Sequence, residues 1–170
     1  MKIDLVKFSN SLHLEADALL KKTDLIKKLS KYGEVRISGS YDLNLMMDGD
    51  IDLFVINKNF SKKKSVHILQ DLIIKNDFGG YLYYDWSTRS HIGFPKGYYI
   101  GLKTEFKKRK WKVDVWLVNE TFKPTEKLVN SIKSKLNKKN ISTILRLKYN
   151  AKKQGLNLRS SDIYKKVLGI

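Results

Sequence analysis

The chain has 170 residues, of which 42% are hydrophobic and 11% aromatic. This composition is typical of a globular protein, and the length suits one domain with a hydrophobic core rather than two. The absence of cysteine excludes disulfide bonds and cysteine metal sites. No apolar run approaches the roughly 18 residues that span a membrane. Residues 1–5 show no signal-peptide pattern, so we expect a cytoplasmic protein without a membrane partner.

The formal net charge is +17, from 34 lysines and arginines against 17 acidic residues. A chain this basic invites a nucleic-acid interpretation. Lysine supplies most of the charge, however, whereas dedicated phosphate-binding sites usually favour arginine. Lysine together with abundant asparagine and isoleucine is also the profile that an AT-rich coding sequence imposes on exposed positions. We therefore interpret the charge as compositional more than functional, and keep polynucleotide binding as an alternative that is not favoured.

Hydrophobic periodicity divides the first part of the chain into helices and strands. Apolar residues at helical spacing predict two helices, over about 13–32 and 62–76. Alternating residues predict three strands, over 34–38, 50–56 and 81–86. Gly33 is expected to end the first helix as a C-terminal cap, residues 41–49 to form a turn or partial helix, and residues 87–97 to form a loop.

A hairpin is predicted from two further strands, 98–106 and 111–118, joined by a four-residue turn. This turn places Phe106 opposite Trp111, and counting back places Lys103 opposite Asp114. One face then carries only apolar residues, namely Ile100, Leu102, Val113, Val115 and Leu117. The opposite face carries charged ones, namely Lys103, Glu105, Lys112 and Asp114. A slip of one residue would mix the two sets, which favours this register.

Three helices are predicted in the last part of the chain, at about 125–137, 142–154 and 161–168. The fold class is therefore α/β (α+β), with a mixed, mostly antiparallel sheet covered by helices. We expect residues 1–124 to form the core and residues 125–170 to form a helical annex of the same domain.

Acidic residues interrupt the two most apolar of the predicted strands. Asp50 and Asp52 alternate with Ile51 and Leu53, so both carboxylates lie on one face of their strand, about 7 Å apart. Acids in such a run are costly unless they are paired or bind a metal. Asp114 interrupts the second strand between two valines. Three carboxylates on neighbouring strands can hold two divalent ions roughly 3.5–4 Å apart, as in phosphoryl transfer.

A Gly-Ser pair completes the pattern. The first strand runs into Gly39 and Ser40, nine residues (41–49) separate them from Asp50-Ile-Asp52-Leu, and Val-Asp114-Val follows later. This order resembles the nucleotidyltransferase superfamily related to DNA polymerase β, over about residues 35–118, and small stand-alone members in particular. One departure is Gly49, since antibiotic-modifying and antitoxin-type members often carry Ser or Thr just before the first Asp.

The resemblance implies a Mg²⁺-dependent enzyme, with Mn²⁺ as a possible substitute, that moves an NMP unit from an NTP such as ATP to an acceptor hydroxyl. Asp50, Asp52 and Asp114 would be the catalytic metal ligands. Gly39 and Ser40 would hold the phosphates of the nucleotide. Lys103 would neutralise the carboxylates or contact a phosphate, with a plain ion pair to Asp114 as an equal alternative.

The motif does not specify the acceptor, the oligomeric state or the role of the aromatic residues. The leading acceptor is a small molecule such as an antibiotic, and the alternatives are RNA, a protein hydroxyl of the toxin–antitoxin type, or a non-catalytic protein that binds nucleic acid. The chain is expected to be a monomer or homodimer. Tyr98, Tyr99 and Trp116 are candidates for base stacking, although packing is the more common role of such aromatic residues.

Overall fold

The structure, a computed structural model, describes residues 3–76, 78–88 and 94–170. Its centre is a sheet in the order β1-β2-β5-β4-β3. The strands are β1 (Glu34–Ser38), β2 (Asp50–Ile56), β3 (Gly80–Asp85), β4 (Tyr98–Phe106) and β5 (Arg109–Val118). The pairing of β2 with β5 is parallel, and the other three pairings are antiparallel. The mixed, mostly antiparallel sheet with helices agrees with the predicted fold class.

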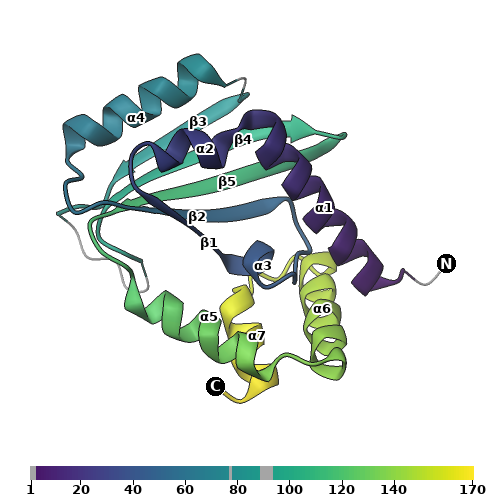
Figure 1. The fold of residues 1–170 in the computed structure, drawn as a ribbon. Helices are drawn as coiled ribbons and strands as arrows, with labels where there is room; N and C mark the ends of the chain where they lie inside the picture. The colour runs from purple at the N-terminus through teal and green to yellow at the C-terminus, as the bar shows by residue number, and fades with distance from the viewer. Residues whose placement is uncertain (1–2, 77, 89–93) are drawn as a thin grey trace.

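Helices cover the sheet from two sides (Figure 1). One layer contains α1 (Leu5–Thr23), α2 (Leu25–Ser30) and α4 (Lys62–Lys75). On the other side lie α5 (Lys123–Lys135), α6 (Lys138–Lys153) and α7 (Ser160–Leu168), which follow the last strand in the chain. A short helix, α3 (Gly39–Asp42), follows β1. Within the described ranges, no helix is both long and apolar enough to cross a membrane.

The main hydrophobic core lies between the sheet and the layer of α1, α2 and α4. Along β2, the side chains of Ile51, Leu53 and Val55 are fully buried in it, while the residues between them face the opposite side. Burying an aliphatic side chain of this size contributes about 1.5–3 kcal/mol to the free energy of folding. Because side chains alternate along a strand, this core fixes the direction of the two β2 carboxylates.

A second buried cluster joins the C-terminal helices to the loop between α3 and β2. Leu45 of this loop is fully buried beside Ile144 and Leu145 of α6. Lys148, also on α6, donates from Nζ to the Leu45 carbonyl at 2.6 Å and lies 3.2 Å from the Tyr164 hydroxyl. The C-terminal helices therefore hold the loop that leads directly into the carboxylate strand.

The N-terminal helical region differs from the prediction. Helix α1 begins at Leu5, capped by Asp4, and a left-handed residue, Asp24 (φ 52°), separates it from α2. Gly33 does not cap a helix, since α2 ends at Ser30; a Cβ at Gly33 would overlap the Ile56 carbonyl of β2. The first predicted helix is thus two helices, and its cap assignment is wrong.

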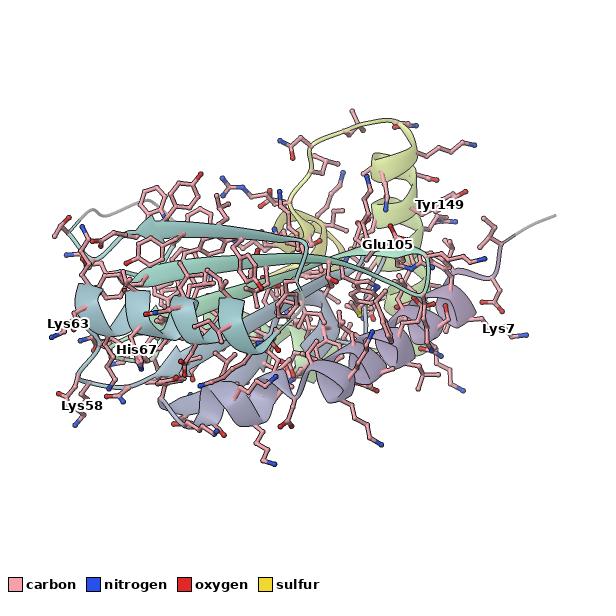
Figure 2. The ribbon with its side chains drawn as sticks, turned by 90° about the horizontal axis from the view of Figure 1, so that it is seen from above. Lys7, Lys58, Lys63, His67, Glu105 and Tyr149 are labelled. Atoms are coloured by element: carbon pink, nitrogen blue, oxygen red, sulfur yellow. The ribbon has the colours of Figure 1, made fainter. Side chains whose placement is uncertain are left out.

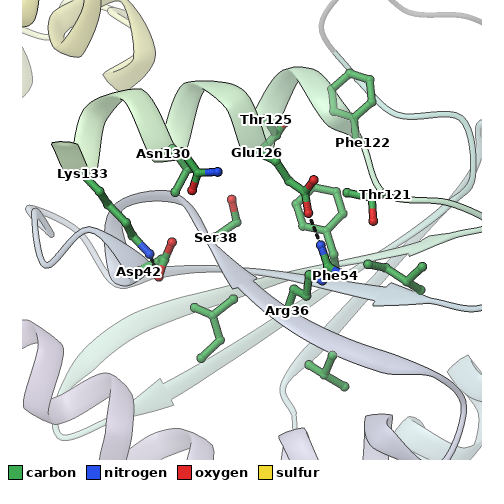
Figure 3. Close-up of a pocket in the computed structure, with 14 residues that line it drawn as sticks. Arg36, Ser38, Asp42, Phe54, Thr121, Phe122, Thr125, Glu126, Asn130 and Lys133 are labelled. Carbon is green, nitrogen blue, oxygen red and sulfur yellow. Dashed lines mark hydrogen bonds and ion pairs between the residues drawn. The ribbon is translucent and has the colours of Figure 1, made fainter.

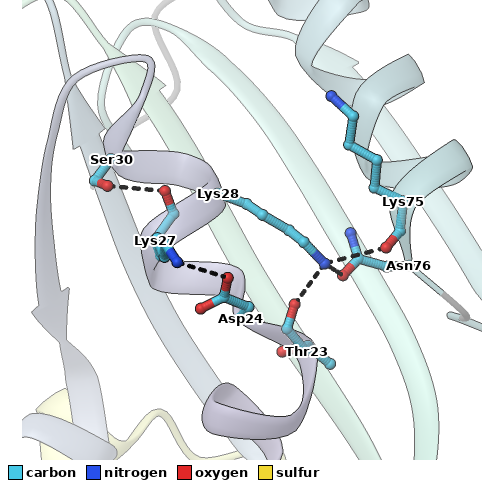
Figure 4. Close-up of polar contacts among 7 residues, drawn as sticks. All are labelled: Thr23, Asp24, Lys27, Lys28, Ser30, Lys75 and Asn76. Carbon is cyan, nitrogen blue, oxygen red and sulfur yellow. Dashed lines mark hydrogen bonds and ion pairs between the residues drawn. The ribbon is translucent and has the colours of Figure 1, made fainter.

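Lys28 of α2 explains how this helix pair is tied down (Figure 4). Its Nζ donates to the Thr23 carbonyl at 2.7 Å, to the Lys75 carbonyl at 3.1 Å and to Asn76 Oδ1 at 2.9 Å. One ammonium group therefore satisfies carbonyls at the C-terminal ends of α1 and α4, where a cation is also favoured by the helix dipole.

The hairpin is built with a shorter turn than predicted. Phe106 pairs with Arg109, and the two turn residues, Lys107 and Lys108, have φ values of 51° and 60°. Positive φ at both central positions matches the twist of a two-residue hairpin, but Lys-Lys lacks the Asn-Gly signature that reveals such a turn. The predicted pairing of Lys103 with Asp114 is therefore wrong: Lys103 lies opposite Lys112.

The error of the register is two residues, and a shift of two leaves every side chain on its predicted face. Ile100, Leu102, Val113, Val115 and Leu117 are accordingly buried in the core, as predicted. The remaining strands and helices agree with the prediction to within a few residues. Of the expected loop at 87–97, residues 89–93 lie outside the described residues.

Candidate active site

The three predicted carboxylates lie on one face of two adjacent strands. In the parallel pairing of β2 with β5, Asp52 is opposite Asp114 and Asp50 is opposite Lys112. Their neighbours Ile51, Leu53, Val113 and Val115 point into the core on the other face. The register of β2 and β5 therefore brings together three acids that lie up to 64 residues apart in the sequence.

Lys112 is the cation of this cluster. Its Nζ lies 2.8 Å from Asp114 Oδ2 and 3.6 Å from Asp50 Oδ1. Sequence reasoning placed Lys112 on the correct face but assigned its role to Lys103, because the turn was expected to be four residues long. Lys103 is exposed and faces Lys112 across the hairpin. A two-residue turn in the prediction would have placed Lys103 opposite Lys112 instead of Asp114.

Tyr99 of β4 binds the third acid. Its hydroxyl donates to Asp114 Oδ1 at 2.6 Å. A Cβ on Gly101, the residue opposite Asp114, would lie only 2.7 Å from this hydroxyl, so the glycine makes room for the contact. Burial and the hydrogen bond to Asp114 together raise the pKa of Tyr99 well above its usual value, so the tyrosine stays a donor. The sequence suggested only stacking or packing for this residue.

The cluster carries more negative charge than its neighbours neutralise. Burial raises the pKa of Asp52 to about 7, and the charges of Asp50 and Asp114 contribute in the same direction. Burial also raises the pKa of Asp50, with Lys112 opposing the shift. For Lys112 itself, burial lowers the pKa, but the hydrogen bond to Asp114 and the surrounding acids outweigh burial and raise it. A site of this kind attracts cations.

Gly39 approaches the acids closely. Its φ is +68°, a conformation that L side chains rarely adopt, and a Cβ at this position would overlap Asp52 Oδ2. Only glycine suits this position, for two reasons: its backbone adopts a positive φ, and the Asp52 carboxylate occupies the space of a side chain. Ser40 follows in the first turn of α3 and lines the same cleft. The structure thus brings both residues of the Gly-Ser pair beside Asp52.

Gly49, the departure from the superfamily pattern, also has a structural explanation. A Cβ at Gly49 would lie 2.5 Å from the Lys110 carbonyl oxygen and 3.1 Å from the ring of Trp111. The chain passes directly against β5 here before it enters β2. A serine or threonine would collide with β5, so glycine is a requirement of this local packing.

Asp50, Asp52 and Lys112 line a cleft of about 970 Å³ between the sheet and the C-terminal helices, and the buried Asp114 lies beside them without lining it. Its opposite wall includes Arg159, Ser160, Ser161 and Asp162, where α7 begins, together with Lys165 about one turn later. The first turn of a helix presents free N–H groups and partial positive charge. The cleft therefore has an acidic wall on the sheet and a wall on α7 with one net positive charge, from Arg159 and Lys165 against Asp162. Sequence reasoning assigned no role to this helix.

The donor atoms of the cluster suit a hard divalent cation, since Mg²⁺ prefers carboxylate oxygen. Within the described residues, Asp50 Oδ1 is buried without a hydrogen bond and has only the 3.6 Å ion pair with Lys112, while burial, together with the neighbouring acids, raises the pKa of Asp52. Within residues 3–76, 78–88 and 94–170, however, no three acidic or histidine side chains converge to metal-binding distances. The donor atoms of these residues fit such an ion in chemistry, and Lys112 supplies one positive charge among them.

In comparisons with known proteins, the chain matches no protein-family model and no curated protein sequence. The resemblance to the nucleotidyltransferase superfamily thus depends on the motif residues themselves. Their placement on one face of the sheet is the finding that a functional hypothesis has to explain.

Proposed function

We propose that this protein is a Mg²⁺-dependent nucleotidyltransferase that moves an NMP unit from an NTP to an acceptor hydroxyl. The observation that carries the proposal is the placement of Asp52 directly opposite Asp114, with Asp50 on the same face. Three buried or half-buried acids with one lysine among them are expensive for a fold of this size. A requirement for cation and phosphate binding explains why the chain keeps them.

Each residue of the site has its own role in the proposed reaction. Asp50 and Asp52 would hold the divalent ions, and Asp114 would face the acceptor. Gly39 and Ser40 lie beside Asp52, where backbone N–H groups and a hydroxyl can bind the phosphates. Arg159 and the first turn of α7 face them across the cleft and would bind the same negative charge. When bound, the ions neutralise the triphosphate and lower the pKa of the attacking hydroxyl.

In the transfer step the acceptor oxygen forms a bond to the α-phosphorus, the bond from that phosphorus to the bridging oxygen breaks, and pyrophosphate leaves with the electron pair. The hydroxyl proton passes to Asp114. One oxygen of Asp114 already accepts from Tyr99 and the other from Lys112, and a carboxylate has lone pairs left for one more donor. These two contacts hold Asp114 in position.

The presence of Lys112 among the acids supports one competing function, a non-catalytic protein that binds nucleic acid. A lysine among carboxylates can neutralise them without a metal, as in a protein that binds nucleic acid and catalyses nothing. The distribution of the other lysines opposes a dedicated polynucleotide surface: Figure 2 shows Lys58 and Lys63 at one end of the molecule and Lys7 at the other. RNA binding that weakens steeply with salt would support the competing function, because phosphate neutralisation releases counterions.

The direct test is incubation with each NTP, labelled at the α-phosphate, and Mg²⁺ against total RNA, protein and a panel of hydroxyl-bearing antibiotics. We expect label to be transferred to one acceptor class, with a small molecule as our leading candidate. Calorimetry supplies a second test: Mg²⁺ should raise the NTP affinity of the native protein, and Asp52→Asn should abolish this gain. Asp48→Asn, at an exposed acid paired with Lys152, is the control. Equal metal-independent NTP binding by native protein and Asp52→Asn would overturn the proposal.

A further inference from the structure

A second cavity lies between the edge strand β1 and helix α5 (Figure 3), and it adjoins the carboxylate cleft. Its volume is about 500 Å³, within the range of small-molecule binding sites. Five residues line both hollows, namely Ser38, Phe54, Phe122, Thr125 and Val129. A ligand held at the carboxylates can therefore extend into this cavity.

The charged residues of the cavity are already paired. Arg36 forms ion pairs with Glu34 and Glu126. Lys133 pairs with Asp42 at 2.8 Å, and Figure 3 shows the contacts of Arg36 with Glu126 and of Lys133 with Asp42. With both cations neutralised, the remaining polar groups are uncharged hydroxyls and an amide. This contrasts with the wall of the cleft at α7, where Arg159 and Lys165 outnumber Asp162. The cavity is thus chemically suited to the neutral part of a nucleotide, and the cleft to its phosphates.

Ser38 lies at the junction of the two hollows. It pairs with Asp52 across β1 and β2, is only 7% exposed, and directs its hydroxyl toward α5 (Figure 3). Its side chain makes no capping hydrogen bond to α3. Because Ser38 lines both hollows, a ligand in either can reach it. A ligand hydroxyl beside Asp52 can hydrogen-bond it, and the ribose of a nucleotide carries one.

Asn130 on α5 supplies the means of selecting a base. Its exposed side chain extends from α5 toward the cavity, whose lining also includes Val129 and Phe54. A carboxamide offers one donor and one acceptor side by side, which matches the amino group and ring nitrogen of adenine. On the corresponding edge of guanine, N7 and O6 are both acceptors, which suit a free guanidinium or ammonium. Arg36 and Lys133 are occupied by their ion pairs.

We propose that the cavity between β1 and α5 binds the nucleoside part of the donor nucleotide and selects adenosine. Ser38 hydrogen-bonds a ribose hydroxyl, Asn130 binds the adenine edge, and the phosphates run past Gly39 to the carboxylates. The path of the phosphates rests on the function proposed above. Adenosine binding in the cavity does not, because it requires neither metal nor transfer.

The test measures binding of three probes to the full chain by calorimetry: adenosine, guanosine and inorganic tripolyphosphate. We expect adenosine to bind more tightly than guanosine. Asn130→Ala and Ser38→Ala should each weaken adenosine binding about tenfold, the loss expected for a hydrogen bond to a ligand, and leave tripolyphosphate binding unchanged. The controls are Asn150→Ala, an exposed helical asparagine on α6, and Ser134→Ala, an exposed serine of α5 outside the cavity.

Equal binding of adenosine and guanosine, or adenosine binding that both cavity variants leave intact, overturns the assignment. A parallel loss of tripolyphosphate binding also overturns it, since the variants would then have disturbed the cleft as a whole. Failure of the proposed function can be told apart from failure of the cavity assignment. If the native protein transfers no nucleotide but loses adenosine in Asn130→Ala, the cavity assignment stands alone. If it transfers AMP and GMP equally well with or without Asn130, the function stands and the cavity assignment fails.

Discussion

The Tyr99 hydroxyl lies 2.6 Å from Asp114 Oδ1, on the neighbouring strand. The contact joins a tyrosine of β4 to the least exposed of the three acids, and Lys112 holds the other oxygen of the same carboxylate at 2.8 Å. Asp114 is thus held from both sides before any ligand arrives. Such preorganisation lowers the cost of placing a charged group in a transition state.

Replacing Tyr99 by phenylalanine should loosen this arrangement. The carboxylate loses a buried donor, and hydrogen bonds to charged groups contribute about 1.5–3 kcal/mol, so urea denaturation should show a loss of stability of this order. Nucleotide transfer should fall as well, because Asp114 is no longer fixed. Tyr84→Phe is the matched control, since Tyr84 lies on the same face but is 47% exposed. Equal effects of the two substitutions would show that the contact to Asp114 is unimportant.

Lys112 and Lys103 face each other across the hairpin, yet only Lys112 contacts the acids. Removing Lys112 leaves Asp50, Asp52 and Asp114 without their cation. We expect Lys112→Ala to be less stable than the native protein without metal, and to gain more from Mg²⁺, because the ion replaces the lost charge. Thermal melts with and without Mg²⁺ measure both effects.

Lys103→Ala is the control for this experiment and also tests the assignment made from sequence. With Lys103 exposed and opposite another lysine, its replacement should leave the Mg²⁺-dependent shift unchanged. If Mg²⁺ raised the melting temperature of Lys103→Ala more than that of Lys112→Ala, Lys103 would be the cation of the site, as the sequence predicted.

Gly39 offers a test of how closely the backbone approaches Asp52. Alanine at Gly39 has to adopt a left-handed conformation, at a cost of about 1–2 kcal/mol, and must also displace the Asp52 carboxylate. Gly155→Ala is the control, since Gly155 has nearly the same φ (+66°) and a Cβ added there would meet no atom within 4 Å. The difference between the two free energies of unfolding isolates the contact with Asp52. Identical losses would mean that Asp52 moves aside without cost.

The sequence predicted most of the sheet because its signals are local. Alternation of Asp50 and Asp52 with Ile51 and Leu53 fixes both the strand and its buried face, and the structure agrees. What sequence reasoning missed depends on how distant segments pair. The register of the hairpin follows from a turn with positive φ at two lysines, and the contact of Lys112 with Asp50 follows from the parallel pairing of β2 with β5. The cavity that Ser38 lines depends on α5, about 90 residues later in the chain. None of these pairings leaves a periodic pattern in the sequence.

Asp52 should make the stability of the metal-free protein depend on pH. Its pKa is about 7 in the folded protein, raised chiefly by burial, against about 3.9 in an unfolded chain. An acid whose pKa is raised by folding stabilises the protein fully below its unfolded pKa, and this stabilisation is lost as the pH rises through the folded pKa. The free energy of unfolding should therefore fall between about pH 4 and pH 7. Each unit of pKa difference is worth about 1.4 kcal/mol, so the total is on the order of a few kcal/mol.

Asp52→Asn removes the titrating group and keeps the shape of the side chain. We expect it to flatten the pH dependence and to be more stable than the native protein at pH 7.5 without metal, because one of three like charges is gone. Urea denaturation at pH 5 and pH 7.5 measures both effects, with the exposed Asp48→Asn as the control. Saturating Mg²⁺ and NTP should reverse the order at pH 7.5, since only the native carboxylate gains from the cation. A variant with unchanged pH dependence and no gain in stability would show that Asp52 is already neutralised in the folded protein.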